Sequence, residues 1–317
     1  MTPDTADPPA LHAEAPAEAS SPDDLLHLAR ERARHGDWEG ARILAQDAAD
    51  VPGDHQPVAR YLTALCLEFE GRLPEALAAY DALMVDAPSD DTRFRRAECL
   101  GKMGRIAEAR DQLDDIARVR ALSEADQVKV GVLLATWDLE LGKERKALKQ
   151  LRRVLASAGQ EAAYYQAMAR SELLHHALDQ ADELTFDGSD KAKAKALERR
   201  AGLIAVSEDQ LVQTITLGEV GYALDGFLRL GRSYEDLGVD LLAESPVRGL
   251  TDAQLAINRD LLEERVEKVW VKGTLFYDRA VQLAARENWT GAPLAEIHAS
   301  WERLEHRVDE LAAEESP

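Results

Sequence analysis

Hydrophobic residues recur at intervals of three and four along nearly the whole chain, beginning at Leu25. This spacing places them on one face of an α-helix, so it predicts a succession of amphipathic helices. The alternating pattern that indicates β-strands is scarce. Turn residues interrupt the helical pattern at regular places along the chain. We therefore predict an all-α fold of helices joined by tight turns.

Four of the turns contain a glycine at similar distances along the chain. Gly36, Gly71, Gly104 and Gly142 follow one another at steps of 35, 33 and 38 residues. An alanine stands five residues after each glycine, and another stands seven residues before it. Glycine suits the left-handed end of a helix, and alanine lets two antiparallel helices approach closely. The eight alanines are Ala41, Ala76, Ala109, Ala147, Ala29, Ala64, Ala97 and Ala135.

This pattern resembles the tetratricopeptide repeat, a helix–turn–helix unit of about 34 residues. The resemblance covers residues 25–157 as four units. It implies a right-handed solenoid in which the first helix of each unit lines a concave face that binds a protein partner. Four positions depart from the pattern. Ala45 is small where the other units have large residues, and Glu144 replaces the apolar residue that stands two positions after the other turn glycines. Arg96 and Asp138 are charged where apolar residues are usual.

The repeat pattern weakens after residue 157. Residues 158–216 predict a degenerate helical pair, and residues 217–292 restore part of the pattern. There we predict a split repeat whose second helix, at 271–284, is delayed by an insertion of roughly 30 residues. Residues 293–317 predict a last helix that caps the solenoid, with a dimerisation seam as the alternative. Its apolar positions are Leu294, Ile297, Trp301, Leu304, Val308 and Leu311.

The split unit and the last helix also resemble the C-terminal part of large tetratricopeptide-repeat proteins of myxobacteria and relatives. Some of those proteins belong to envelope or motility assemblies, so an envelope association is a second expectation for this chain. No stretch approaches the roughly 20 apolar residues of a membrane span. A secretion signal would need a positively charged start, but no Lys or Arg precedes Arg30. Two cysteines, Cys66 and Cys99, do not make a disulfide framework. We expect a cytoplasmic bacterial protein that does not insert into membranes.

The charge of the chain limits its partners. A net charge of −21, from 38 basic and 59 acidic residues, argues against binding to nucleic acid. Residues 1–24 hold five prolines, six alanines and six acidic residues without a basic one, which predicts a disordered acidic tail. This tail either serves solubility alone or docks on a basic segment of the same chain. Residues 142–153 and 191–200 are basic enough for that role.

Motifs that carry chemistry are missing from the sequence. We find no phosphate-binding loop, nucleophile elbow or dinucleotide fingerprint. His298, Glu302 and His306 share one helix face, but nothing near them in sequence supplies a fourth metal ligand. We therefore expect a solvated helix face there, no metal, no cofactor, no catalytic residue, and a protein that is not an enzyme.

The resemblance also assigns the surface that would bind a partner. Groove-facing positions of tetratricopeptide repeats lie ten, six and two residues before the turn glycine, and this spacing keeps them on one stripe. Apolar, aromatic and charged groups together suit an amphipathic helix or an extended peptide. The twelve residues are Leu26, Tyr61, Phe94 and Val132, then Arg30, Leu65, Glu98 and Thr136, then Arg34, Phe69, Lys102 and Glu140.

These positions predict a non-enzymatic interaction scaffold or adaptor that holds a protein or peptide partner in its groove. One alternative is that Tyr61, Leu65 and Phe69 pack against the chain's own later helices or its tail. The protein would then be a self-occluded regulatory or chaperone-like module. Another alternative is a component of a bacterial envelope or motility assembly.

Overall fold

The computed structural model describes residues 21–119, 122–157, 159, 162–243, 249–291 and 293–314. Those residues contain thirteen α-helices and no β-strand, so the all-α prediction is confirmed. The chain divides into two compact units after Ile116, and each unit is described by itself. The tail expected over residues 1–24 lies mostly outside the described residues. Its expected end differs from the structure, because the first helix already begins at Pro22 with Ser21 as its cap.

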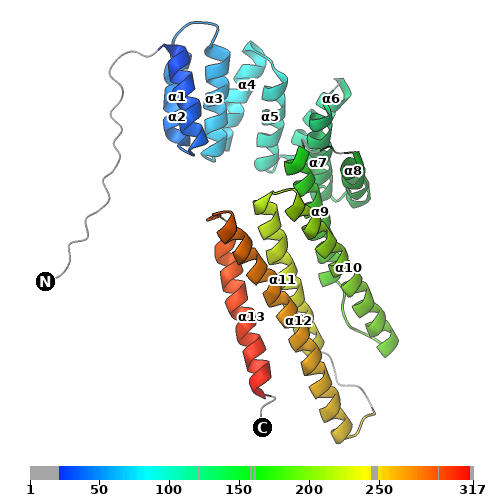
Figure 1. The fold of residues 1–317 in the computed structure, drawn as a ribbon. Coiled ribbons are helices and arrows are strands. Elements are labelled where there is room, and N and C mark those ends of the chain that lie inside the picture. The colour runs from blue at the N-terminus through cyan, green and yellow to red at the C-terminus, as the bar shows by residue number, and fades with distance from the viewer. Residues whose placement is uncertain are drawn as a thin grey trace, which may run out of the picture. The chain divides into compact units, whose positions relative to one another are not determined.

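The first unit is a row of antiparallel helices in which each of the first four packs against the next (Figure 1). A hydrogen bond from Arg96 to Gln112 (2.9 Å) joins the fifth helix to the sixth. The sixth helix crosses the division between the units. The helices are α1 (Pro22–Arg34), α2 (Trp38–Asp50), α3 (Gln56–Phe69), α4 (Leu73–Asp86), α5 (Asp90–Lys102) and α6 (Ile106–Val119).

The four predicted glycine turns share one backbone geometry. Their φ angles lie between 71° and 79°, the left-handed region that side chains with a Cβ disfavour. In each turn the N–H of the residue after the glycine donates to the carbonyl five residues earlier, which closes the helix end. At the first turn, Asp37 also caps α2 by accepting a hydrogen bond from the Gly40 N–H (2.9 Å). The four glycines are Gly36, Gly71, Gly104 and Gly142.

The eight alanines at fixed offsets from these glycines are all buried, with at most 1% of their surface exposed. In the first unit, Ala29, Ala41, Ala45, Ala48 and Ala59 form much of a core between α1, α2 and α3. Because alanine adds so little bulk, the helix backbones can lie close together there. Ala45, which is smaller than the repeat pattern leads one to expect, thus lies in a core made mainly of small side chains. The predicted repeat of turn and packing is confirmed.

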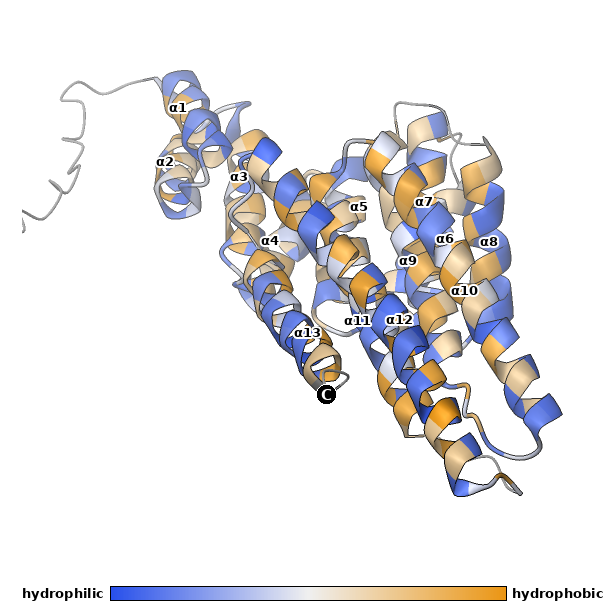
Figure 2. Ribbon diagram, turned by 60° about the horizontal axis from the view of Figure 1, so that its bottom comes forward, coloured by the Kyte–Doolittle hydropathy of each residue, from blue (hydrophilic) through white to orange (hydrophobic). Residues whose placement is uncertain are grey.

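The second unit contains the fourth predicted repeat and a bundle of longer helices (Figure 1). Its largest core lies among α9 to α13, and a smaller one lies among α7, α8 and α9. In Figure 2 hydrophobic and hydrophilic residues alternate along the long helices, as expected where one face is buried. The helices are α7 (Glu124–Glu140), α8 (Glu144–Ser157), α9 (Ala163–Asp182), α10 (Asp190–Thr216), α11 (Val220–Leu242), α12 (Asp252–Arg286) and α13 (Leu294–Glu314).

The structure differs from the prediction of a delayed second helix at 271–284. Instead α12 already begins at Asp252 and runs for 35 residues beside α11, which has 23. The additional residues therefore lengthen both helices of one hairpin. Aromatic rings lie against helix glycines at their contact, since a Cβ on Gly231 would meet the Tyr277 ring and one on Gly238 would meet the Trp270 ring. Periodicity alone does not reveal these ring-on-glycine contacts.

The apolar face of the last helix, α13, packs into the core of the second unit. Ile297, Leu304 and Leu311 are buried in the large core, and Trp301 and Val308 pack against the same core. The α12–α13 turn has the geometry of the glycine turns, although its left-handed residue is Asn288 (φ 53°). These contacts cover the seam within the second unit, and the dimerisation alternative stays a prediction.

The glycine turns generate the first testable prediction. Gly71→Ala should lower the free energy of unfolding by about 1 to 2 kcal/mol, because alanine is strained at positive φ although space for its Cβ is free. Gly202→Ala is the matched control, since this exposed helical glycine in α10 also has free space around a Cβ. It should be stabilising by up to about 1 kcal/mol. Urea unfolding followed by circular dichroism measures both, and equal effects of the two substitutions would contradict the turn assignment.

Candidate functional site

The first predicted row of the groove is mostly core. Leu26 and Phe94 are 3% and 7% exposed in the first unit, and Val132 is fully buried in the second unit. Leu26 packs in the α1–α3 core, and Val132 packs in the core of α7, α8 and α9. Their burial leaves no surface for a partner, so these three assignments are corrected to packing positions. Tyr61 alone in this row keeps part of its ring accessible.

The second and third rows remain at the surface to different degrees. Arg30, Arg34, Phe69 and Lys102 are exposed in the first unit, whereas Leu65 is half-buried against the α1–α3 core. Glu98 is half-buried and pairs with Arg95 at 3.5 Å. Thr136 (half-buried) and Glu140 (exposed) lie on α7 in the second unit and are not part of the first unit's surface. Of the exposed groove residues in the first unit, Lys102 holds its ammonium beside the Phe69 ring.

Three side chains form what we call the Phe69 cluster: Trp38, Phe69 and Lys102. The rings of Trp38 and Phe69 stack with their centroids 4.2 Å apart and their planes 8° from parallel. Lys102 holds its ammonium 5.7 Å from the Phe69 centroid, within cation–π range. Phe69 nevertheless exposes 46% of its surface. The cluster is thus a pre-positioned aromatic surface supplied by the start of α2 and the ends of α3 and α5.

A buried carboxylate beneath this cluster holds Lys102 in place. The side chain of Glu68 is fully buried, and its Oε1 accepts a hydrogen bond from Lys102 Nζ at 2.6 Å. Its Oε2 accepts one from the Tyr80 hydroxyl at 2.8 Å, and Arg95 lies 3.8 Å away. Burial, with the neighbouring Glu68 charge, raises the pKa of Tyr80, so the phenol keeps its proton and donates. Sequence analysis missed Glu68, because an acid three residues before a turn glycine carries no signal of burial.

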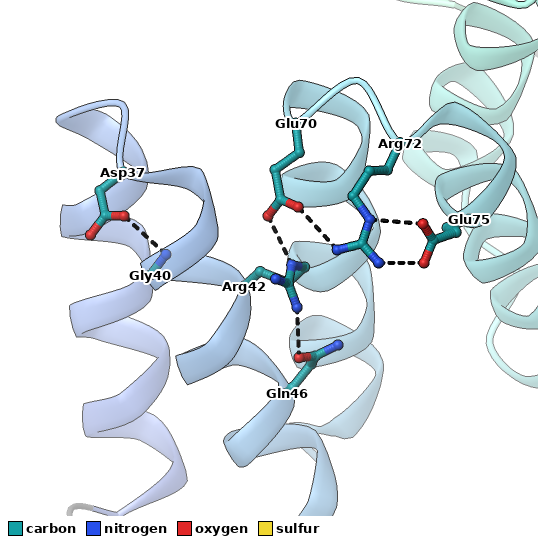
Figure 3. Close-up of polar contacts among 7 residues, drawn as sticks. All are labelled: Asp37, Gly40, Arg42, Gln46, Glu70, Arg72 and Glu75. Carbon is teal, nitrogen blue, oxygen red and sulfur yellow. Dashed lines mark hydrogen bonds and ion pairs between the residues drawn. The ribbon is translucent and has the colours of Figure 1, made fainter.

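A second polar network joins the first two repeats next to this surface (Figure 3). Arg42 on α2 donates to Glu70 at 2.8 Å and to Gln46 at 3.1 Å. Glu70 follows α3 and also accepts from Arg72 (3.2 Å), which pairs through its Nε with Glu75 at 2.8 Å. Because Glu70 directly follows Phe69, this network fixes the end of α3 against the neighbouring repeat. It is a structural network that supports the Phe69 cluster.

The groups considered for metal or thiol chemistry lie apart in the structure. Among the described residues there is no group of three or more His, Cys, Asp or Glu side chains that could hold a metal ion. His306 pairs with Glu310 (3.2 Å). Cys66 and Cys99 are buried free thiols, and burial raises the pKa of each to about 11, which keeps them protonated. In the described part of the chain, no helix is both long and apolar enough to span a membrane.

An ionic contact in the second unit joins α9 to α11. His175 Nε2 lies 2.7 Å from Asp225 Oδ2, and Ser171 donates to the same oxygen at 3.4 Å. The contact with Asp225 raises the pKa of His175 in spite of its burial. Burial alone would raise the pKa of Asp225, but the contact with His175 lowers it. Nearby, burial also raises the pKa of Glu172 on α9. The positive charge of Arg229 on α11 lowers the pKa of His175, but by less than Asp225 raises it.

The repeated turn, the buried alanines and the antiparallel pairs define an α-helical repeat protein. The first helix pairs, joined by left-handed glycine turns, have the helix–turn–helix form that the tetratricopeptide resemblance predicted. No family profile and no curated protein matches the sequence. Among solved structures, a tetratricopeptide repeat protein from Parabacteroides merdae is similar at 13% identity, over 89% of this chain and 98% of that chain, with a TM-score of 0.41. A TPR repeats protein from Bacteroides fragilis is similar at 13% identity, over 91% and 100%, with a TM-score of 0.32. The resemblance to myxobacterial proteins stays a prediction.

The buried carboxylate generates a stability prediction. Tyr80→Phe removes a hydrogen bond to a charged acceptor and should cost about 2 kcal/mol of unfolding free energy. Lys102→Met should cost less, because the Lys102 side chain is 49% exposed and water replaces part of its contact. Urea unfolding of both variants checks this order. An unchanged midpoint for Tyr80→Phe would show that Glu68 does not depend on the phenol.

The His175–Asp225 contact predicts a pH-dependent contribution to stability. A histidine with a raised pKa stabilises the fold below its ordinary pKa of about 6.5, and this contribution is lost as the pH rises through the folded-state value. The lowered pKa of Asp225 removes the contribution again in strong acid. The melting temperature of wild type should thus exceed that of His175→Gln by more at about pH 6 than at about pH 9. A difference that is the same at both values would contradict an ionic contact.

Proposed function

We propose that this chain is a non-enzymatic interaction scaffold that binds a peptide or helix of a partner protein around Phe69. The observation that carries the proposal is the Phe69 cluster, with its 46% exposed ring stacked on Trp38. A large aromatic group that is already held in place loses little conformational entropy when a partner covers it. Such groups are typical anchors of protein interfaces.

The surroundings of Phe69 favour an amphipathic partner. Leu65 and Tyr61 extend the apolar surface along α3 at intervals of four residues, which matches one face of a helix or a short extended peptide. Lys102 on one side and the exposed Arg30 and Arg34 on α1 supply positive charge in the same unit. We therefore propose that the partner segment carries an apolar or aromatic anchor flanked by acidic residues.

The same charges favour one alternative, a self-occluded regulatory module. Residues 1–20 contain four acidic residues and neither lysine nor arginine, and they come just before the helix that begins at Pro22 and carries Arg30 and Arg34. An acidic segment so close in sequence has a high effective concentration at these arginines. The C-terminal helix is a poorer occupant, because Ile297, Leu304 and Leu311 are already buried in its own unit.

The scaffold proposal is tested by replacing Phe69 and a matched control on the same unit. A photo-crosslinking amino acid at position 69 should yield a discrete protein adduct in cells, and one at position 85 should not. Val85 is the control because it is 83% exposed on α4 and outside the predicted groove positions. With the adduct identified and purified, Phe69→Glu should weaken binding by about tenfold or more, and Val85→Glu should leave it near the wild-type value. Equal effects of the two substitutions would reject the surface around Phe69.

Deletion of residues 1–20 separates the scaffold from the self-occluded module. This deletion keeps Ser21, which caps α1. A self-occluded groove should bind the partner more tightly once the acidic tail is gone, and the gain should shrink at high salt because exposed charges are screened. With an open groove, the deleted chain should bind the partner as tightly as wild type does at each salt concentration, and that outcome would reject occlusion by the tail.

A further inference from the structure

A pocket of about 620 Å³ opens in the second unit, at the end of the bundle where α9 and α11 begin. Tyr164 comes from α9, Tyr222 from the start of α11, and Trp289 from the turn between α12 and α13. Glu219 and Asp225 are the acidic residues that line it. Three aromatic side chains from three separate segments therefore meet around one space.

The aromatic walls have defined positions. The rings of Tyr164 and Tyr222 lie edge to face, 5.5 Å apart at 64°. Trp289 covers Gly221, since a Cβ on that glycine would lie 3.3 Å from the indole ring. The turn that carries Trp289 is closed by the left-handed Asn288 and by a hydrogen bond from the Trp289 N–H to the Ala284 carbonyl (2.8 Å). The three rings are thus placed by the fold before any ligand arrives.

The charge of the pocket is negative. None of its described lining residues is a lysine or an arginine. Glu219 lies close enough to Tyr222 that its carboxylate helps to raise the pKa of that phenol, after burial and the hydrogen bond with Tyr164. The Tyr222 phenol therefore stays neutral at physiological pH. Asp225 is already paired with His175, so Glu219 is the lining carboxylate that disfavours an anionic ligand and favours a cation.

We propose that this pocket binds an alkylammonium group, such as the side chain of a lysine or N-methylated lysine on a protein partner. Ring faces attract such cations through their quadrupoles, and a carboxylate at the edge of the rings adds a direct charge interaction. A neutral group of the same shape would gain only the apolar contact. The site lies entirely within the second unit and is separate from the surface around Phe69.

The proposal is tested on the full chain with tetramethylammonium chloride and with tert-butyl alcohol, its neutral counterpart of similar shape. Titrations followed by NMR of the indole N–H signals should give saturable binding of the cation, and the alcohol should bind about fivefold more weakly or worse. Equal affinity for the two probes, or no saturable binding of the cation, would overturn the proposal.

Variants show whether the binding occurs in this pocket. Trp289→Leu keeps an apolar side chain but removes a ring, and Glu219→Gln removes a charge with little change of shape. Each should weaken cation binding about threefold to tenfold. Glu198→Gln, at an exposed acid on α10 outside the pocket, should leave it unchanged. Thermal melts confirm that Trp289→Leu folds, and Glu219→Gln carries the test if it does not. Wild-type affinity in Glu219→Gln and in a folded Trp289→Leu would refute the site.

A last comparison identifies the source of the cation. Two probes present the same trimethylammonium headgroup. One is a short peptide that contains trimethyl-lysine, and the other is free choline. Tighter binding of the peptide assigns the pocket to protein recognition, as we propose, because the peptide backbone adds contacts at the rim. Tighter binding of choline would contradict that source and would assign the pocket to a small metabolite.

Discussion

Close approach of neighbouring helices at small residues is the constraint on which this structure depends. The chain is poor in aromatic residues, and alanines such as Ala41, Ala76 and Ala109 are fully buried where helices meet. Alanine contributes little apolar area by itself, so cohesion comes from many short backbone contacts. Larger side chains at these positions would push the helices apart, at a cost of about 1 to 3 kcal/mol each. The left-handed turn at glycines such as Gly71 serves the same end, because it reverses the chain within the three residues between two helices.

The second unit satisfies this constraint with rings and glycines. Trp270 and Tyr277 lie over Gly238 and Gly231, and the Trp270 indole donates to the Glu235 carbonyl at 3.0 Å. These contacts let α11 and α12 form one long hairpin where the sequence pattern predicted a broken repeat. The last helix then covers the exposed side of that hairpin. Its connecting turn also places an indole ring at the pocket for which we propose cation binding, so the same elements that close the core build that site.

The turns and the buried alanines could be predicted because both follow from local spacing. The burial of charged residues inside the repeats could not be predicted, because their partners lie in a turn or on another helix. Asp138 was a departure from the repeat pattern, and the structure pairs it with Lys146 (2.8 Å) and Lys143 (3.4 Å) after the next turn. Glu68 gave no signal at all, although it holds Lys102 beside Phe69. The groove prediction included the exposed Phe69 and Lys102 together with buried positions, since helix spacing identifies a face and not its exposure.

Hydrogen–deuterium exchange tests binding around Phe69 most directly. It compares the full chain alone with the full chain in the presence of the purified partner that crosslinking identified. A partner seated there should slow exchange in α3 and α5, whose ends carry Phe69 and Lys102, and leave α4 around Val85 unchanged. The protection should disappear in Phe69→Glu. Protection confined to α2 and α4, or protection that persists in Phe69→Glu, would contradict the assignment of this surface as the binding site.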